Sequence, residues 1–167
     1  MSGLHLHLLV NHAPILGAFF ALGLLVASFR WAPDVLRRTA LVALVGVALA
    51  GAAAKFTGEP AEDGARGLPG VTRAAIHAHE EAADTAFIAA GLLGLASLGA
   101  LVRWRRAPLP TGAVLVALAG ALGVAGLMAY TGLLGGQVRH TEVRPGATAA
   151  DASAIEPPRA RRPAPEP

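Results

Sequence analysis

Six histidines are the residues of this chain most able to do chemistry, and three of them lie close together near its start. His5, His7 and His12 lie at the head of an apolar segment that carries no charge before Arg30. The other three histidines are His77, His79 and His140. Imidazole nitrogens ligate haem iron and divalent metal ions. If the fold gathers these side chains, they predict a cofactor or metal site.

The elements that must position these histidines are membrane-spanning helices. Of the 167 residues, 54% are hydrophobic, and the long uncharged runs are long enough to cross a bilayer. We expect an all-α, four-helix transmembrane bundle, antiparallel and up-down, over residues 1–140. The proline-rich remainder, residues 141–167, lacks apolar periodicity and is predicted to be disordered. The predicted spans are residues 6–29, 36–56, 80–102 and 111–135.

Positive charges in the two short loops predict the orientation. The first loop carries three arginines against Asp34, and the third carries three arginines and no acid. By the positive-inside rule both loops are cytoplasmic, so both termini are extracytoplasmic. The arginines are Arg30, Arg37, Arg38, Arg103, Arg105 and Arg106.

The composition also excludes several classes of function. The chain has no cysteine, which rules out disulfides, iron–sulfur clusters and thiolate metal sites. Its net charge of +3 is too small and too dispersed to indicate nucleic-acid binding. No nucleophile–base arrangement or phosphate loop is present, so we expect no enzymatic activity from the chain by itself.

Small residues recur every four positions in the last two predicted spans. Such ridges let helices approach closely in lipid, and they predict a tight bundle. The alternative is that some of these positions make room for a flat cofactor. The ridges are Ala82, Ala86, Ala90 and Gly94, and Ala113, Ala117, Ala121, Ala125 and Ala129.

Counting helical rise from the arginines puts the polar residues in two layers at the outer end. His12 lies about 27 Å above Arg30, whereas His5 and His79 both lie at about 36–37 Å. The lower layer also holds Lys55 and Asp84, for which we predict an ion pair. The other members of the lower layer are Asn11, Thr57, Thr85, Tyr130 and Thr131, and those of the upper layer are His77 and His140.

The position of each histidine on its helix predicts whether its side chain points into the bundle or toward the outside. His79 points down the small apolar face of its helix, and His7 is predicted to lie at the surface. Pro14 leaves the Val10 carbonyl without its helical partner. This either bends the span and turns His12 inward, or marks the first turn of a helix that starts near Asn11.

The first functional hypothesis is b-type haem used in electron transfer with an extracytoplasmic redox protein or quinol. Two histidines on facing helices would be the axial ligands, and His12 and His79 are the predicted pair. His5, at the depth of His79, is the alternative to His12. Supporting roles are assigned to Asn11, Lys55, Tyr130 and His140. Against this stands the reading that these histidines simply bond to water and carbonyl groups at the interface.

The second hypothesis is a non-haem divalent metal site, because nitrogen and carboxylate ligands are close together in the sequence. The competing interpretation is a solvated acidic helix start. The third hypothesis is a non-catalytic membrane subunit whose polar end docks a partner, in a homo-oligomer or a larger membrane complex. The predicted metal ligands are His77, His79, Glu80, Glu81, Asp84 and His140.

Several of these motifs together resemble a bacterial four-helix membrane-protein family, a domain-of-unknown-function class with a His-Phe-Pro-Ile signature in the first span. The chain has Ala13 where that signature has phenylalanine. The resemblance covers residues 4–142 and implies a four-helix, multi-pass protein of the bacterial inner membrane. Its motif histidines would be His12, His79, His140 and one of His5 or His7. The motifs are His5-Leu6-His7, Asn11-His12-Ala13-Pro14-Ile15, residues 57–62, residues 79–82 and residues 135–140.

Overall fold

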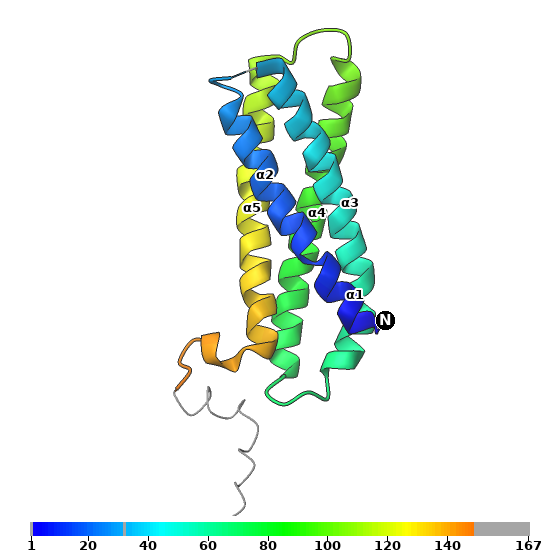
Figure 1. The fold of residues 1–167 in the computed structure, drawn as a ribbon, viewed down its shortest axis with the longest axis vertical. Coiled ribbons are helices and arrows are strands. Elements are labelled where there is room, and N and C mark those ends of the chain that lie inside the picture. Colours follow the sequence, from blue (N-terminus) through cyan, green and yellow to red (C-terminus); the bar gives the residue numbers. More distant parts are fainter. Residues whose placement is uncertain (1, 32, 149–167) are drawn as a thin grey trace, which may run out of the picture.

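The computed structural model describes residues 2–31 and 33–148, and every regular element within them is a helix. Figure 1 shows the long helices lying side by side as one bundle. This confirms the prediction of an all-helical protein for the described residues. The elements are α1 (Gly3–Val10), α2 (His12–Ala27), α3 (Pro33–Ala65), α4 (Arg73–Arg103), α5 (Thr111–Arg139) and the short 3-10 helix η1 (Thr141–Val143).

Four helical stretches are long and apolar enough to cross a membrane, as predicted. They are Gly3–Ala27, which comprises α1 and α2, then α3, α4 and α5. Many large apolar side chains lie on the outside of the bundle, where only lipid would shield them from water. Examples that are about two thirds exposed are Leu16, Leu49, Leu95 and Val116. The chain is therefore a multi-pass membrane protein.

The first span is broken at Asn11 into two helices. α2 begins at His12, so Pro14 lies in its first turn, where a missing N–H costs little. Two roles were predicted for Pro14, a bend within one helix or the first turn of a new helix. The structure has the second. α1 contributes no residue to the buried core, and it packs chiefly on α3.

α3 extends nine residues beyond its predicted end at residue 56, and it continues through Pro60 to Ala65. The extension persists because Ala61 and Ala65 on its inner face are buried. α1 lies against this extension. A Cβ atom at Gly3 would lie 2.7 Å from the Cβ and 2.9 Å from the carbonyl oxygen of Pro60. Only glycine at this position lets the two backbones come so close.

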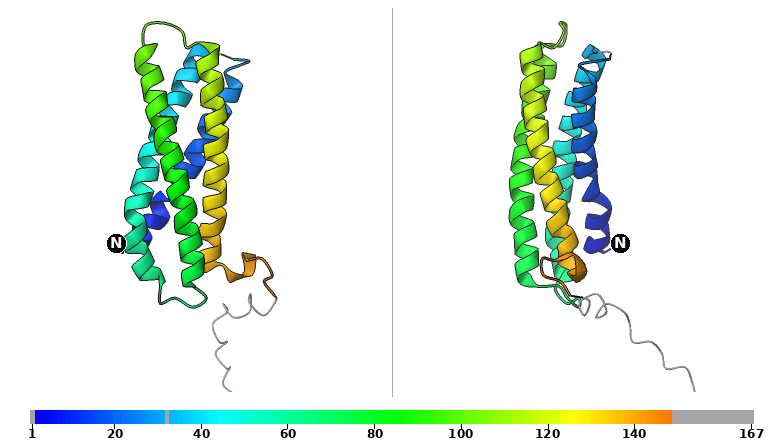
Figure 2. Two further views of the ribbon diagram at one scale, coloured as in Figure 1. Left: turned by 180° about the vertical axis from the view of Figure 1, so that it is seen from behind. Right: turned by 90° about the vertical axis from the view of Figure 1, so that its left-hand side faces the viewer.

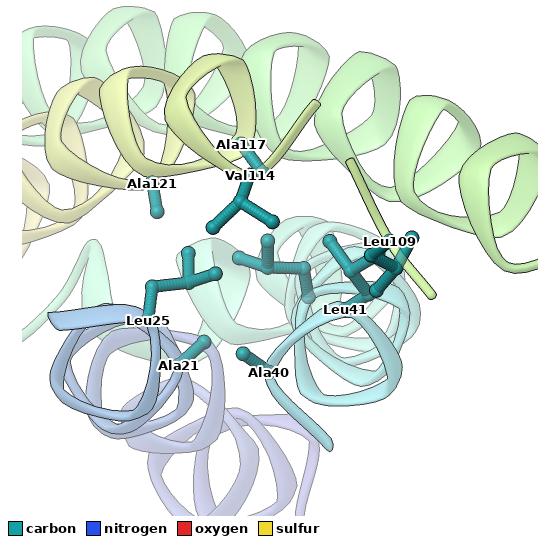
Figure 3. Close-up of a cluster of buried hydrophobic side chains, with 9 residues drawn as sticks. Ala21, Leu25, Ala40, Leu41, Leu109, Val114, Ala117 and Ala121 are labelled. Carbon is teal, nitrogen blue, oxygen red and sulfur yellow. The ribbon is translucent and has the colours of Figure 1, made fainter. Parts of the chain in front are cut away.

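The other three helices close a ring with α3, since α2 packs on α3 and α5, and α4 packs on the same two helices. Figure 2 shows the α4 and α5 side of this ring from behind. One core cluster joins α2, α3 and α5 around Leu25, Leu44 and Val114, and Figure 3 shows its side chains. Most of each predicted small-residue ridge lies inside the bundle as a packing surface, whereas Ala129 at the end of the α5 ridge is exposed. Their buried members are Ala86, Ala90, Gly94, Ala117, Ala121 and Ala125.

The two ends of the bundle differ in chemistry. We call the end formed by α1, the α3–α4 loop and residues 139–148 the histidine end. The opposite end, formed by the α2–α3 and α4–α5 loops, is the arginine end. Figure 1 shows the chain start beside the lower end of α3, at the histidine end.

The described part of the predicted disordered tail, residues 141–148, is held against the bundle. The Arg144 guanidinium donates hydrogen bonds to the carbonyl oxygens of Gln137 (2.8 Å), Val138 (3.0 Å) and Gly70 (2.8 Å). These bonds tie the end of α5 to the α3–α4 loop. The prediction for residues 149–167 lies outside the described residues.

Candidate functional site

His7, predicted to lie at the surface, is half-buried against α3. Its Nδ1 lies 3.2 Å from the Ala54 carbonyl oxygen and 3.2 Å from Thr57 Oγ1. A carbonyl oxygen can only accept a hydrogen bond, so Nδ1 carries the hydrogen and Nε2 carries the lone pair. The surface prediction was wrong because α1 packs on the extension of α3. Gly3 and His7, four residues apart, share the face that meets α3.

His79 faces the interior, as predicted, and contacts α5. Its Nδ1 lies 3.1 Å from the Thr131 carbonyl oxygen, so this ring also donates from Nδ1 to the main chain. The imidazole lies close to Gly135, where a Cβ atom would be 3.0 Å from Cε1 and 3.3 Å from Nδ1. Because Gly135 has no side chain, the His79 ring fits between α4 and α5.

His7 and His79 share one arrangement, and their helices, α1 and α4, both pack on α3. In both rings Nδ1 is engaged by a main-chain carbonyl group, and Nε2 has no hydrogen-bond partner within the part of the chain that the structure describes. Histidines that bind metals commonly show this pattern, in which one nitrogen donates to an oxygen and the other is the ligand.

His12 and His5 do not join this pair. The His12 side chain is exposed, and its Nδ1 lies 3.4 Å from the carbonyl oxygen of Leu8 on the same span. His5 is also exposed, with Nδ1 2.8 Å from Ser2 Oγ. Five residues of helix turn a side chain by about 140°, so a span that directs His7 toward α3 directs His12 away from it. The predicted pairing of His79 with His12 or His5 is therefore not assembled.

The predicted supporting residues do not surround the pair. The side chains of Tyr130 and His140 are exposed, and His140 Nδ1 lies 2.9 Å from Glu142 Oε1. The pKa of Glu142 is lowered, first by a hydrogen bond from its own backbone N–H and then by His140. Asn11 differs from both, since its Oδ1 is buried without a hydrogen-bond partner.

The predicted ion pair between Lys55 and Asp84 is present, with the Lys55 ammonium donating to the Asp84 carboxylate. Both side chains are about half exposed. The pair joins α3 to α4 one residue beyond Ala54, whose carbonyl holds His7. Lys55 therefore supports the framework of the site without contacting either imidazole.

The six predicted metal ligands are dispersed among other partners. Asp84 pairs with Lys55, and His77 lies on the outer surface with Nδ1 3.6 Å from Glu81 Oε1. Glu80 turns toward Glu62 on α3. Across residues 2–31 and 33–148, no group of three or more His, Asp and Glu side chains is placed to hold a metal ion. The predicted ligands are separated because residues two positions apart lie on nearly opposite faces of a helix. His79 therefore faces the interior, and His77 lies on the outer surface.

A second polar feature at the histidine end is a charged pocket of about 240 Å³. Within it the Arg66 guanidinium donates to Glu62 Oε1 (2.7 Å), and this bond raises the pKa of Arg66. The predictions assigned Glu62 and Arg66 to a loop. Their spacing of four residues was the available sign that α3 continues. We call this the charged pocket, and its lining residues are Glu62, Arg66, Arg73, His77 and Glu80.

Comparisons with known proteins found no matching family model, no matching curated protein and no matching solved structure. The resemblance noted in the sequence thus stays a prediction. The case for a functional site depends on the geometry of its own residues.

Proposed function

We propose that this protein binds b-type haem through His7 and His79 and transfers electrons to or from an extracytoplasmic redox protein or quinol. The observation that carries the proposal is the shared arrangement of the two half-buried imidazoles. Each has Nδ1 engaged by a main-chain carbonyl and Nε2 without a partner in the described residues. His7 takes the role that the sequence assigned to His12.

A pair of histidines fits haem better than a free metal ion. A b-type haem would need only two imidazole ligands from the protein, and His7 and His79 would supply them. A zinc, copper or manganese ion needs three or four protein ligands, and the described residues offer no such group. The geometry therefore favours the first hypothesis over the non-haem metal site.

The chain's own residues would orient the ligands and tune them. Hydrogen bonds from Nδ1 to the carbonyls of Ala54 and Thr131 fix the tautomer of each ring and make Nε2 a stronger donor to a metal. When bound, the haem would supply one-electron redox chemistry. The two imidazoles hold positions on different helices, α1 and α4, which a ligand between them would bridge.

α1 carries His7 and contributes no residue to the buried core. It is separated from α2 at Asn11 and packs chiefly on α3, where the hydrogen bond between His7 and Ala54 would hold the ligand in place. Gly58 and Gly135 lie beside the two rings and present no side chain to them. The two positions beside the rings are thus free of bulky side chains.

We also propose that the bundle is antiparallel and up-down in the bacterial inner membrane, with both termini and the histidine pair on the extracytoplasmic side. Two observations support this. The arginine end carries six arginines in its loops and adjoining helix ends, which the positive-inside rule assigns to the cytoplasm. The chain start and Arg144 both lie at the opposite end, beside the α3–α4 loop.

An absorption spectrum of the detergent-purified protein tests haem binding. We expect a Soret band after expression in a bacterial host with added haem precursor, and α and β bands that sharpen on reduction, as in six-coordinate b-type haem. The absence of a Soret band at adequate haem supply would contradict the proposal. Elemental analysis of the same sample would then test for a non-haem metal ion.

A second function, docking of a partner protein or a further membrane subunit, is favoured by the charged pocket. Its residues lie on α3, α4 and the α3–α4 loop at the exposed end of the bundle, where a protein outside the membrane could reach them. A purified protein without haem or metal that co-purifies with one defined partner from its native membrane would support this function. Loss of that partner in an Arg66→Gln, Arg73→Gln double variant would assign the contact to the pocket.

A further inference from the structure

The arginine end contains a second polar pocket, of about 450 Å³, that the proposed function does not use. It lies between the start of α3 and the α4–α5 loop. We call it the arginine pocket. The residues that line it are Asp34, Arg38, Arg105, Arg106, Ala107 and Pro108.

One wall of the arginine pocket is fixed by Arg38. Its Nε donates to Asp34 Oδ2 (2.8 Å), and its Nη2 donates to the carbonyl oxygens of Trp104 (3.0 Å) and Ala107 (2.7 Å). Asp34 in turn accepts a hydrogen bond from the backbone N–H of Leu109 at 3.3 Å. These bonds join α3 to the α4–α5 loop and give the pocket a defined shape.

The other two arginines of the pocket have no acidic partner. Arg105 and Arg106 are exposed, and neither side chain makes a hydrogen bond or ion pair within the described residues. Asp34, the pocket's acid, is already bonded to Arg38. The lining carries three arginines against one aspartate, which leaves a charge of +2. Such a pocket attracts an anion.

We propose that the arginine pocket binds the phosphodiester headgroup of an anionic membrane lipid. Guanidinium groups bind phosphate oxygens in bidentate fashion, and two unpaired guanidinium groups match one or two phosphodiesters. The pocket lies where α3 begins and α4 ends, so it is level with the lipid headgroups. The exposed Trp31, a residue type enriched at that level, lies in the adjoining loop at the same end. Location thus favours a lipid over phosphate from solution.

Thermal unfolding of the full-length protein in mixed micelles tests this proposal. Adding phosphatidylglycerol should raise the unfolding midpoint by about 3 °C above the value with the same amount of phosphatidylcholine. An Arg105→Gln, Arg106→Gln double variant should lose most of that difference. Each protein is compared with itself in the two lipids, so a change in its basal stability does not affect the result.

The matched control is an Arg30→Gln, Arg103→Gln double variant, which removes the same charge from the same end outside the pocket. We expect it to keep the phosphatidylglycerol effect. An equal loss in both double variants would overturn the proposal, because it would indicate general surface attraction. Equal midpoints in the two lipids for the native protein would also overturn it, as would the same rise with inorganic phosphate alone.

Discussion

At the scale of single residues, the candidate site depends on which nitrogen of each imidazole is engaged. His7 and His79 use Nδ1 for main-chain carbonyls on neighbouring helices, whereas His12 uses Nδ1 for a carbonyl of its own span. The first two rings are therefore fixed by tertiary packing. Among residues 2–31 and 33–148, His12 has no hydrogen-bond partner outside its own span, which is why it serves as a control for the other two.

The ion pair between Lys55 and Asp84 gives a prediction at this scale. Replacing Asp84 by Asn should lower the free energy of unfolding in detergent by less than about 1 kcal/mol, because both side chains are about half exposed. Thermal or denaturant unfolding would measure the change. Glu81→Gln is the control, since Glu81 is an exposed acid on the same helix whose partner is His77.

A double-variant cycle with Lys55→Gln decides whether the two groups interact. If the loss in the Asp84→Asn, Lys55→Gln protein equals the sum of the single losses, the pair makes no net contribution. A smaller loss than the sum is the predicted outcome.

At the scale of elements, the position of α1 determines which histidine is available. The sequence predicts the first span as one helix and the second as ending at residue 56. The composition of residues 58–60, Gly-Glu-Pro, predicts a turn, although α3 continues through these residues to Ala65. Without that extension α1 has no surface to pack on, and so His7 could not be placed from periodicity alone.

Gly3 offers a test of this packing. An alanine there would put its Cβ 2.7 Å from the Cβ of Pro60, and neither the proline ring nor the adjacent carbonyl can rotate away. We therefore expect Gly3→Ala to separate α1 from α3 and to increase hydrogen exchange of the α1 backbone by at least about tenfold, whereas α2 to α5 change little.

The control for this variant is Gly23→Ala in α2, where a Cβ atom would meet nothing within 4 Å. Alanine favours helix over glycine, so this change should leave exchange in α1 unaltered and slightly stabilise α2. Unchanged exchange of α1 in Gly3→Ala would contradict the close contact with Pro60.

At the scale of the whole molecule, the fold could be predicted from the sequence because a bilayer requires long apolar helices. Most of the candidate site could not be predicted in this way. Long uncharged runs can hardly be anything other than spanning helices, so all four spans were found, and the small-residue ridges marked the packed faces. Of the proposed haem ligands, His79 was predicted because its own helix face is apolar. The burial of His7 was not predicted because the residues that surround it, Ala54 and Thr57, belong to α3 and not to its own helix.

The absence of cysteine allows a direct test of orientation. Single cysteines placed at Gly67, in the α3–α4 loop, and at Ala107, in the α4–α5 loop, are both exposed. In intact cells whose outer membrane has been made permeable, a membrane-impermeant maleimide should label the cysteine at 67 and not the one at 107. The reverse pattern would place the histidine end in the cytoplasm.

The central claim is that His7 and His79, and not His12, hold a haem. The most direct measurement is the reduced-minus-oxidised absorption spectrum of the purified protein and of its His7→Ala, His79→Ala and His12→Ala variants, produced with equal haem supply. We predict that the b-type bands are lost in the His7 and His79 variants and kept in the His12 variant. Bands that survive both of the first two substitutions, or that disappear with His12→Ala alone, would contradict the account.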